Sequence, residues 1–268
     1  MNAMIFLWLV VSIAMILFTI LKLKLNPTIS LILGSIFMGL ACGLGPQATV
    51  SAITSGFGNL MTGIGLSVGF GVILGQLLSD SNGAKVIATT MVSATSEKYA
   101  LYALGITGFI LSVPVFYDVT FVILIPLAIA VSRQIRKPLP YTAGAIIIGA
   151  GAAHTLVPPT PNPLAAAEIL NFDLGIMVIV GLILGLVSSV IAIKIYTVLL
   201  DKGMWNSKQD ETGIEVYEET KSGKEENQPS FFMSLLPVIL PVVLILIGTV
   251  VGAVMEETPG WISFISNK

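Results

Sequence analysis

The chain has 268 residues, of which 55% are hydrophobic and only 10% are charged, and its formal net charge is -2. Soluble domains carry about 25% charged residues, so this composition, with a mean hydropathy of +0.94, excludes an ordinary soluble protein. The single cysteine, Cys42, excludes a disulfide scaffold and a thiolate metal site. Continuous apolar runs of about 20 residues recur along the sequence, which predicts an all-α polytopic membrane protein rather than a β-barrel of alternating polarity.

The first two predicted membrane spans cover about Met4–Leu21 and Ile29–Leu44. The first lacks the positive start and the cleavage site of a signal peptide, so we expect it to remain in the membrane. Lys22 and Lys24 lie in the short connection and predict a cytoplasmic turn, which places the N-terminus outside. The basic cluster RQIRK, residues 133–137, is predicted to be cytoplasmic for the same reason.

A glycine-rich stretch follows from Gly56 to Asp80, with seven glycines between positions 56 and 75. Because glycine costs about 1 kcal/mol in a helix, this density needs a reason. The sequence allows two interpretations of this stretch. Either the small-xxx-small spacing allows close helix packing, or the stretch is a re-entrant hairpin with a non-helical tip near residues 58–63. A polar turn then precedes a helix predicted to begin near Ala84.

Asp118 lies in the middle of a long apolar stretch from Ala100 to Arg133, which Pro114 and Pro126 are expected to interrupt. A carboxylate at the bilayer centre costs about 2.5–3.5 kcal/mol. We therefore take Asp118 as a candidate for proton relay or cation coordination. The alternatives are a buried hydrogen bond to a helix end and a position nearer the interface.

The segment HTLVPPTPNPLAAAE, residues 154–168, holds four prolines in six residues and the single histidine. A helix cannot run smoothly through this cluster, and Asn162-Pro163 is a good N-cap and N1 pair for a new helix. Broken transporter helices hold anions at such ends, so we predict a carboxylate site near Thr160 and Asn162. A Pro-rich surface loop is less favoured, because Glu168 is the only charge in the flanking residues.

His154 is a candidate proton shuttle, since histidine titrates nearest neutral pH; a structural hydrogen bond is the alternative. Glu168 is one or two turns into the new helix and is expected to reach the interface. The sequence has no H-E-x-x-H zinc site, no G-x-S-x-G elbow and no basic patch, so we predict no enzyme activity, no metal, no cofactor and no nucleic-acid partner.

Two further spans, about Leu174–Leu200 and Phe231–Met255, flank a charged segment. Of the 28 charged residues, 12 lie between Asp201 and Glu226. If the proline cluster is the tip of a hairpin, this charged loop lies on the opposite side of the membrane from RQIRK. If the segment crosses, both are cytoplasmic.

Three segments together, residues 56–88, 113–130 and 154–170, resemble in order and spacing the gluconate:proton symporter (GntP) family of permeases. The resemblance implies proton-coupled uptake of gluconate or a related small carboxylate across the cytoplasmic membrane. It implies a fold of two inverted repeats, each with a re-entrant hairpin and a broken helix, and it favours the topology in which the proline-rich segment crosses. Other members of the family carry other sugar acids and D-serine.

The chain departs from the family motif at two positions. The motif often reads His, three residues, then Pro-Pro-His-Pro-Gly-Pro. Thr160 stands at the second histidine, which bears on proton coupling, and Asn162 stands at the glycine. Asn162 adds a side chain where glycine leaves room, which favours a smaller or differently shaped carboxylate.

Family chains are also much longer. The resemblance covers a first membrane repeat (1–200), a hydrophilic central loop (201–229) and the start of a second repeat (230–268). Because the site of such carriers forms between repeats, we expect a truncated portion that transports only when a second polypeptide supplies the rest.

The function expected from these features is secondary transport by a protein of the cytoplasmic membrane. We expect the carboxylate near Asn59, Thr62, Thr160 and Asn162, with Asp118 and His154 as coupling residues. The alternatives are a sodium-coupled carrier or exchanger, a channel-like pore on the same fold and a non-transporting membrane scaffold. The expected partners are the carboxylate, a coupling proton or sodium ion, the lipid bilayer and, in a homo-oligomer, further copies of the chain.

Overall fold

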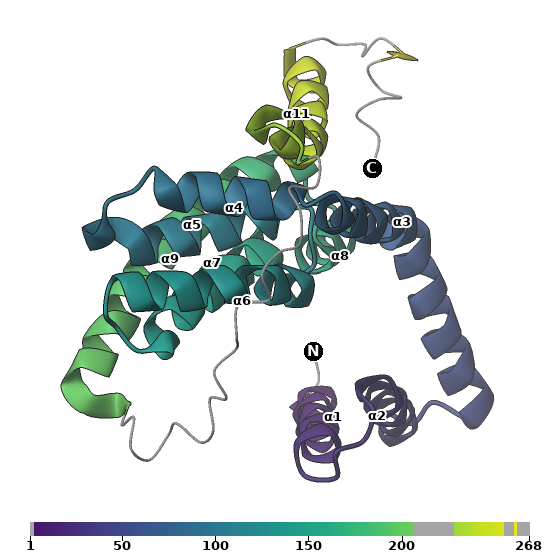
Figure 1. Ribbon diagram of the computed structural model, residues 1–268. Helices are drawn as coiled ribbons and strands as arrows, with labels where there is room; N and C mark the ends of the chain where they lie inside the picture. The colour runs from purple at the N-terminus through teal and green to yellow at the C-terminus, as the bar shows by residue number, and fades with distance from the viewer. Residues whose placement is uncertain (1–2, 206–227, 255–259, 262–268) are drawn as a thin grey trace. The chain divides into compact units, whose positions relative to one another are not determined.

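A computed structural model describes residues 3–205, 228–254 and 260–261, and the regular elements in these residues are helices. Most of the predicted central loop, residues 206–227, lies outside the described residues. The elements are α1 (Ala3–Leu21), α2 (Pro27–Ala41), α3 (Pro46–Asp80), α4 (Gly83–Ser93), the 3-10 turn η1 (Glu97–Tyr99), α5 (Ala100–Leu111), α6 (Tyr117–Gln134), α7 (Leu139–Leu156), α8 (Pro161–Leu170), α9 (Leu174–Leu199), the π-helical turn η2 (Leu200–Met204) and α11 (Phe231–Val254) (Figure 1). The predicted all-α membrane fold is confirmed.

Within the described residues, six helical segments are long and apolar enough to cross a membrane. They are Met4–Leu21, Pro46–Asp80, Tyr117–Gln134, Leu139–Leu170, Leu174–Met204 and Phe231–Val251. α4 and α5 have 11 and 12 residues. At about 1.5 Å per residue they are each too short to cross a hydrocarbon core of about 30 Å.

The chain divides into two compact units, and the first comprises residues 1–63. In this unit α1 and α2 form a helical pair. Trp8 packs edge-to-face on Phe37, with ring centroids 6.0 Å apart. The connecting turn ends where the Asn26 side chain accepts a hydrogen bond from the Thr28 amide at 2.9 Å, and Pro27 takes the first helical position, where its missing N–H costs nothing.

The second unit comprises residues 64–268, and α5, α7 and α9 pack together at its centre. α6 lies along α7, and α4 packs against α5 (Figure 1). A cluster of buried apolar side chains joins α4, α5, α6 and α7; Leu104, Leu111, Leu124 and Ile146 within it are fully buried.

Glycines allow these central helices to approach each other closely. A Cβ atom added to Gly149 of α7 would overlap the backbone of Gly105 in α5, and one added to Gly108 would lie 2.9 Å from the Ile146 carbonyl oxygen. A Cβ atom on Gly181 of α9 would overlap the Leu156 carbonyl oxygen. Close approach of this kind is the usual basis of helix association in membranes, where dispersion replaces the hydrophobic effect.

The glycine-rich stretch differs from one of its two predicted forms. α3 is helical from Pro46 to Asp80, so the predicted non-helical tip at residues 58–63 is wrong. A helix satisfies its backbone hydrogen bonds internally, and in apolar surroundings this outweighs the cost of several glycines. α6 likewise continues through Pro126, where a break was expected.

Contacts between the start of α7 and the end of α9 settle the relative side of two loops. Lys137 Nζ lies 3.3 Å from Asp201 Oδ1, and the Tyr141 hydroxyl donates a hydrogen bond to the same oxygen at 2.8 Å. The Tyr196 hydroxyl donates to the Pro140 carbonyl oxygen at 3.1 Å. The charged loop therefore begins beside RQIRK, as the crossing topology predicts.

Candidate functional site

Two helix interruptions in the second unit supply most of the candidate site. The first comprises residues 112–116, between α5 and α6. Pro114 lacks an N–H and disfavours helical backbone at the preceding residue, and here, unlike at Pro126, the helix stops ahead of the proline, at Leu111. The last turn of α5 closes with hydrogen bonds from the Ser112 and Val115 amides to the carbonyls of Gly108 and Leu111. Phe116 then adopts extended backbone and α6 begins at Tyr117.

The second interruption comprises residues 157–160, between α7 and α8. Val157 is fully buried and Thr160 is 5% exposed. The break is therefore packed inside the unit, which favours the predicted buried break over a surface loop.

The predicted N-cap of α8 is displaced by two residues. The helix starts with Thr160 as N-cap and Pro161 at N1, rather than with Asn162 and Pro163. The reason is that both prolines fall among the first three helical positions, where a missing N–H breaks no intrahelical bond. Thr160, which precedes Pro161, takes the extended backbone that proline imposes.

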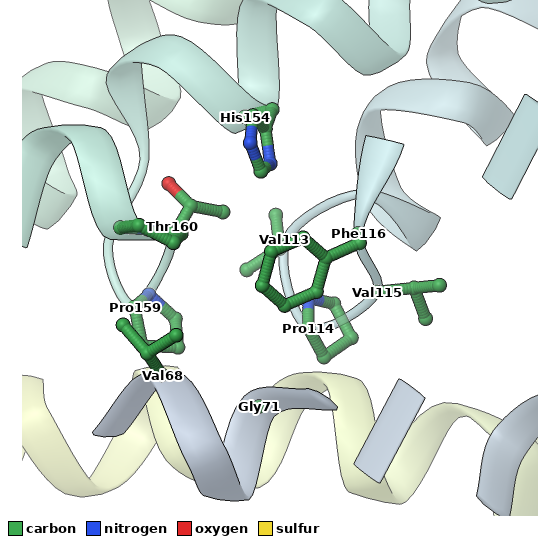
Figure 2. Close-up of a pocket in the computed structure, with 10 residues that line it drawn as sticks. Val68, Gly71, Val113, Pro114, Val115, Phe116, His154, Pro159 and Thr160 are labelled. Carbon is green, nitrogen blue, oxygen red and sulfur yellow. The ribbon is translucent and has the colours of Figure 1, made fainter. Parts of the chain in front are cut away.

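The two interruptions meet around a pocket, and α3 closes one side of it (Figure 2). Most of its roughly 250 Å³ of empty space lies in the open mouth, and the enclosed part has room for about one water molecule. The lining residues come from α3 (Val68, Gly71), the first interruption (Val113, Pro114, Val115, Phe116), the end of α7 (His154), the second interruption (Pro159, Thr160) and the first residue of α8 (Pro161).

His154 joins the two interruptions. Its ring centroid lies 5.7 Å from that of Phe116 and 6.5 Å from that of Tyr117, so the end of α7 packs on the start of α6. Its Nδ1 atom is buried and has no hydrogen-bond partner among the residues that the structure describes. A buried nitrogen without a hydrogen-bond partner destabilises the fold. A ligand, a water molecule or a proton that binds this nitrogen removes that cost.

The start of α8 offers positive potential with few donors. Pro161 and Pro163 have no N–H, so Asn162 supplies the single backbone amide among the first three positions. The Thr160 hydroxyl donates to the Val157 carbonyl oxygen at 2.7 Å, and its oxygen retains acceptor capacity. α8 has no acidic residue in its first turn, so the positive end of its dipole is not neutralised locally.

The sequence profile of the GntP family of permeases matches residues 4–267. The chain belongs to this family.

Curated members of the GntP family match the chain over most of its length. A protein named uncharacterized permease from Haemophilus influenzae is 32% identical over 258 residues, 94% of this chain and 52% of its own length. The high-affinity gluconate transporter of Escherichia coli K12 is 31% identical, covering 86% of this chain and 52% of its own. The gluconate permease of Bacillus licheniformis is 32% identical, covering 93% and 56%. No solved structure matches.

The chain spans about half the length of the curated GntP relatives it matches. Their names are those of permeases and transporters rather than enzymes. With six apolar segments of spanning length among the described residues, membership identifies the chain as a multi-pass protein of the cytoplasmic membrane.

The structure brings some of the candidate GntP site residues together and leaves others apart. Thr160 and His154 line the pocket; Asn162 is exposed, two residues along α8. Asp118 is exposed at the second position of α6, next to Tyr117. Among the described residues, no three His, Cys, Asp or Glu side chains gather as a metal site.

Asn59 and Thr62 are exposed residues of α3 in the first unit. The Thr62 hydroxyl donates to the Gly58 carbonyl oxygen at 2.9 Å, an ordinary intrahelical bond. The α3 residues that do line the pocket, Val68 and Gly71, were not among the predicted site residues. The glycine density of α3 was the signal for them, but it does not say which turn faces the breaks.

Proposed function

We propose that the chain forms part of a secondary transporter that carries gluconate or a related small organic acid into the cell together with protons. The observation that carries this proposal is the pocket between the two helix interruptions, which Thr160 and His154 line. The names of the gluconate-transporting relatives support the substrate class.

The carboxylate is best placed at the start of α8. α6 also directs an N-terminus toward this region, but Asp118 lies in its first turn and supplies negative charge there. α8 has no such residue, so its dipole attracts an anion. The Asn162 backbone amide is the nearest donor along the chain, because the Thr160 hydroxyl already donates its proton to the Val157 carbonyl oxygen.

His154 is the coupling residue in this proposal. It lines the same pocket and has a buried ring nitrogen without a protein partner in the described residues. A proton bound there adds positive charge beside the carboxylate, so proton and anion binding favour each other. Asp118 is the second coupling candidate, one residue from the ring that packs on His154.

A sodium ion is the second candidate for the coupling species. Ser112 lies in the first interruption and Thr120 lies near the start of α6; both hydroxyls are fully buried and have no hydrogen-bond partner among the described residues. Hydroxyl and carbonyl oxygens are ligands that hard cations accept.

Uptake of labelled gluconate into membrane vesicles that carry the full protein tests the proposal. A proton gradient alone should drive accumulation above the external concentration, because coupling requires a thermodynamic driving force. Accumulation under a sodium gradient alone would select the second candidate, and equilibration without accumulation would indicate a pore.

Substitution of His154 and Asp118 tests which of these residues couples proton movement to gluconate transport. His154→Gln should abolish accumulation under a proton gradient while exchange of internal for external gluconate continues, since exchange needs no net proton movement. If His154→Gln and Asp118→Asn both accumulate gluconate as the unsubstituted protein does, neither residue couples.

A further inference from the structure

We infer that Gly71 determines how large a carboxylate the pocket accepts. This inference rests on the proposed function, because it concerns the same site. It assigns a specificity role to a residue of α3 that contributes no functional group of its own.

The face of α3 that carries Gly71 is fixed by its neighbours. Val68 is three residues earlier, lines the same pocket, and directs its side chain toward the second interruption, near Pro159 (Figure 2). Gly75 is four residues later, and a Cβ atom built there would lie 3.2 Å from the Val115 Cα atom in the first interruption. Residues at these spacings share one helix face, so position 71 also faces the interruptions.

The space at Gly71 differs from the space at Gly75. At Gly75 the helix backbone is in tight contact with the first interruption. At Gly71, a Cβ atom would meet no atom within 4 Å, although the residue lines the pocket. The absent side chain therefore leaves open space in the lining of the pocket, and a methyl group added here would enter it without meeting protein atoms.

Filling this volume should discriminate between substrates by size. A single misfitting methylene changes the preference of a pocket by about 10–200-fold. An added side chain at position 71 should reject a six-carbon sugar acid more strongly than a two- or three-carbon carboxylate. The class of ligand is thus a carboxylate whose chain extends from α8 toward α3.

Gly69 provides a matched control. It lies on the same helix, a Cβ atom there also meets nothing within 4 Å, and it does not line the pocket. Gly71→Leu thus adds a side chain to α3 on the pocket side. Gly69→Leu adds the same side chain outside the pocket lining. Gly71→Ala adds one methyl group and covers the case in which leucine prevents folding.

The first measurement is uptake of labelled gluconate and of labelled lactate by the full protein in cells. Gly71→Ala, which adds one carbon, should lower gluconate uptake relative to lactate uptake by about tenfold, and Gly71→Leu should lower it further. Gly69→Leu should leave the ratio unchanged at equal membrane abundance. Equal gluconate uptake by Gly71→Leu and Gly69→Leu overturns the inference.

The second measurement needs no transport. In a cysteine-free background that includes Cys42→Ser, Gly71→Cys and Gly69→Cys are treated with a membrane-permeant maleimide. Gluconate should slow labelling at position 71 and leave position 69 unaffected. Protection at position 71 by other carboxylates but not by gluconate leaves the inference standing and removes gluconate from the proposed function. Equal labelling with and without every carboxylate at position 71 overturns the inference.

Discussion

Proline controls the start of α8 at the level of single residues. An α-helix normally presents four unpaired amides at its N-terminus. In α8, Pro161 and Pro163 remove two of them, the Thr160 amide donates to the Val157 carbonyl oxygen, and the Asn162 amide remains. Such an end attracts an anion through one donor and the helix dipole rather than through a cluster of amides. Recognition at this end therefore depends strongly on the charge at position 162.

Asn162→Asp tests that dependence. A carboxylate in the first turn stabilises a helix by about 0.3–1 kcal/mol, so α8 should still form. Two negative charges about 10 Å apart at an effective dielectric constant of about 20 repel by about 1.7 kcal/mol, which corresponds to more than tenfold weaker anion binding. Gluconate uptake kinetics should show this as a raised KM.

The control for this prediction is Asn162→Ser, which is neutral and keeps the backbone amide. Its KM should stay close to that of the unsubstituted protein. An unchanged KM for Asn162→Asp, with Asn162→Ser as reference, would place the anion elsewhere.

At the level of elements, the central helices depend on backbone-to-backbone contact. α5 and α7 approach each other at Gly105 and Gly149 with no space for a methyl group between them. This packing positions the end of α7, and with it His154, against the start of α6. The geometry of the pocket thus depends on glycines outside the pocket.

Gly149→Ala should therefore destabilise the fold. Overpacking a close contact costs about 1–3 kcal/mol, because α5 and α7 must separate. Gly69→Ala makes the same change where a Cβ atom has open space, and should be neutral or slightly stabilising. Thermal unfolding in detergent compares the two; equal melting temperatures would show that the α5–α7 contact adapts without cost.

The elements that the sequence predicted well are those fixed by local chemistry. α1 matches the first predicted span, and the interruptions near Pro114 and after Val157 follow from missing N–H groups. The continuity of α3 was not decidable, because glycine supports both a tight helix contact and an irregular tip. The glycine density marked α3 as a packing helix, but it could not show which turn forms the third wall of the pocket, since the contact of Gly75 with Val115 depends on tertiary packing.

At the level of the whole molecule, the ion pair between Lys137 and Asp201 fixes a topology. α7 and α8 lead away from RQIRK, and α9 returns the chain to it. The turn between α8 and α9, at residues 171–173, therefore lies at the opposite end of these helices. With RQIRK on the cytoplasmic side by its positive charge, this turn is predicted to face outward.

Single cysteines in a cysteine-free background that includes Cys42→Ser test this topology. A membrane-impermeant maleimide applied to intact cells should label Phe172→Cys, and should label Gln134→Cys and Met204→Cys only after permeabilisation. All three positions are exposed. Labelling of Met204→Cys and Gln134→Cys from opposite sides would contradict the prediction.

The contact between Gly181 and the Leu156 carbonyl oxygen has a consequence for evolution of the site. Since α9 touches the last turn of α7 through bare backbone, the register of one helix against the other dictates where along the chain the interruption falls. Inserting one residue into α9 ahead of this contact rotates a bulky side chain onto that carbonyl. Lineages that lengthen or shorten the protein are thus expected to place their insertions in the connecting loops, leaving the spacing from Asp173 to Gly181 untouched.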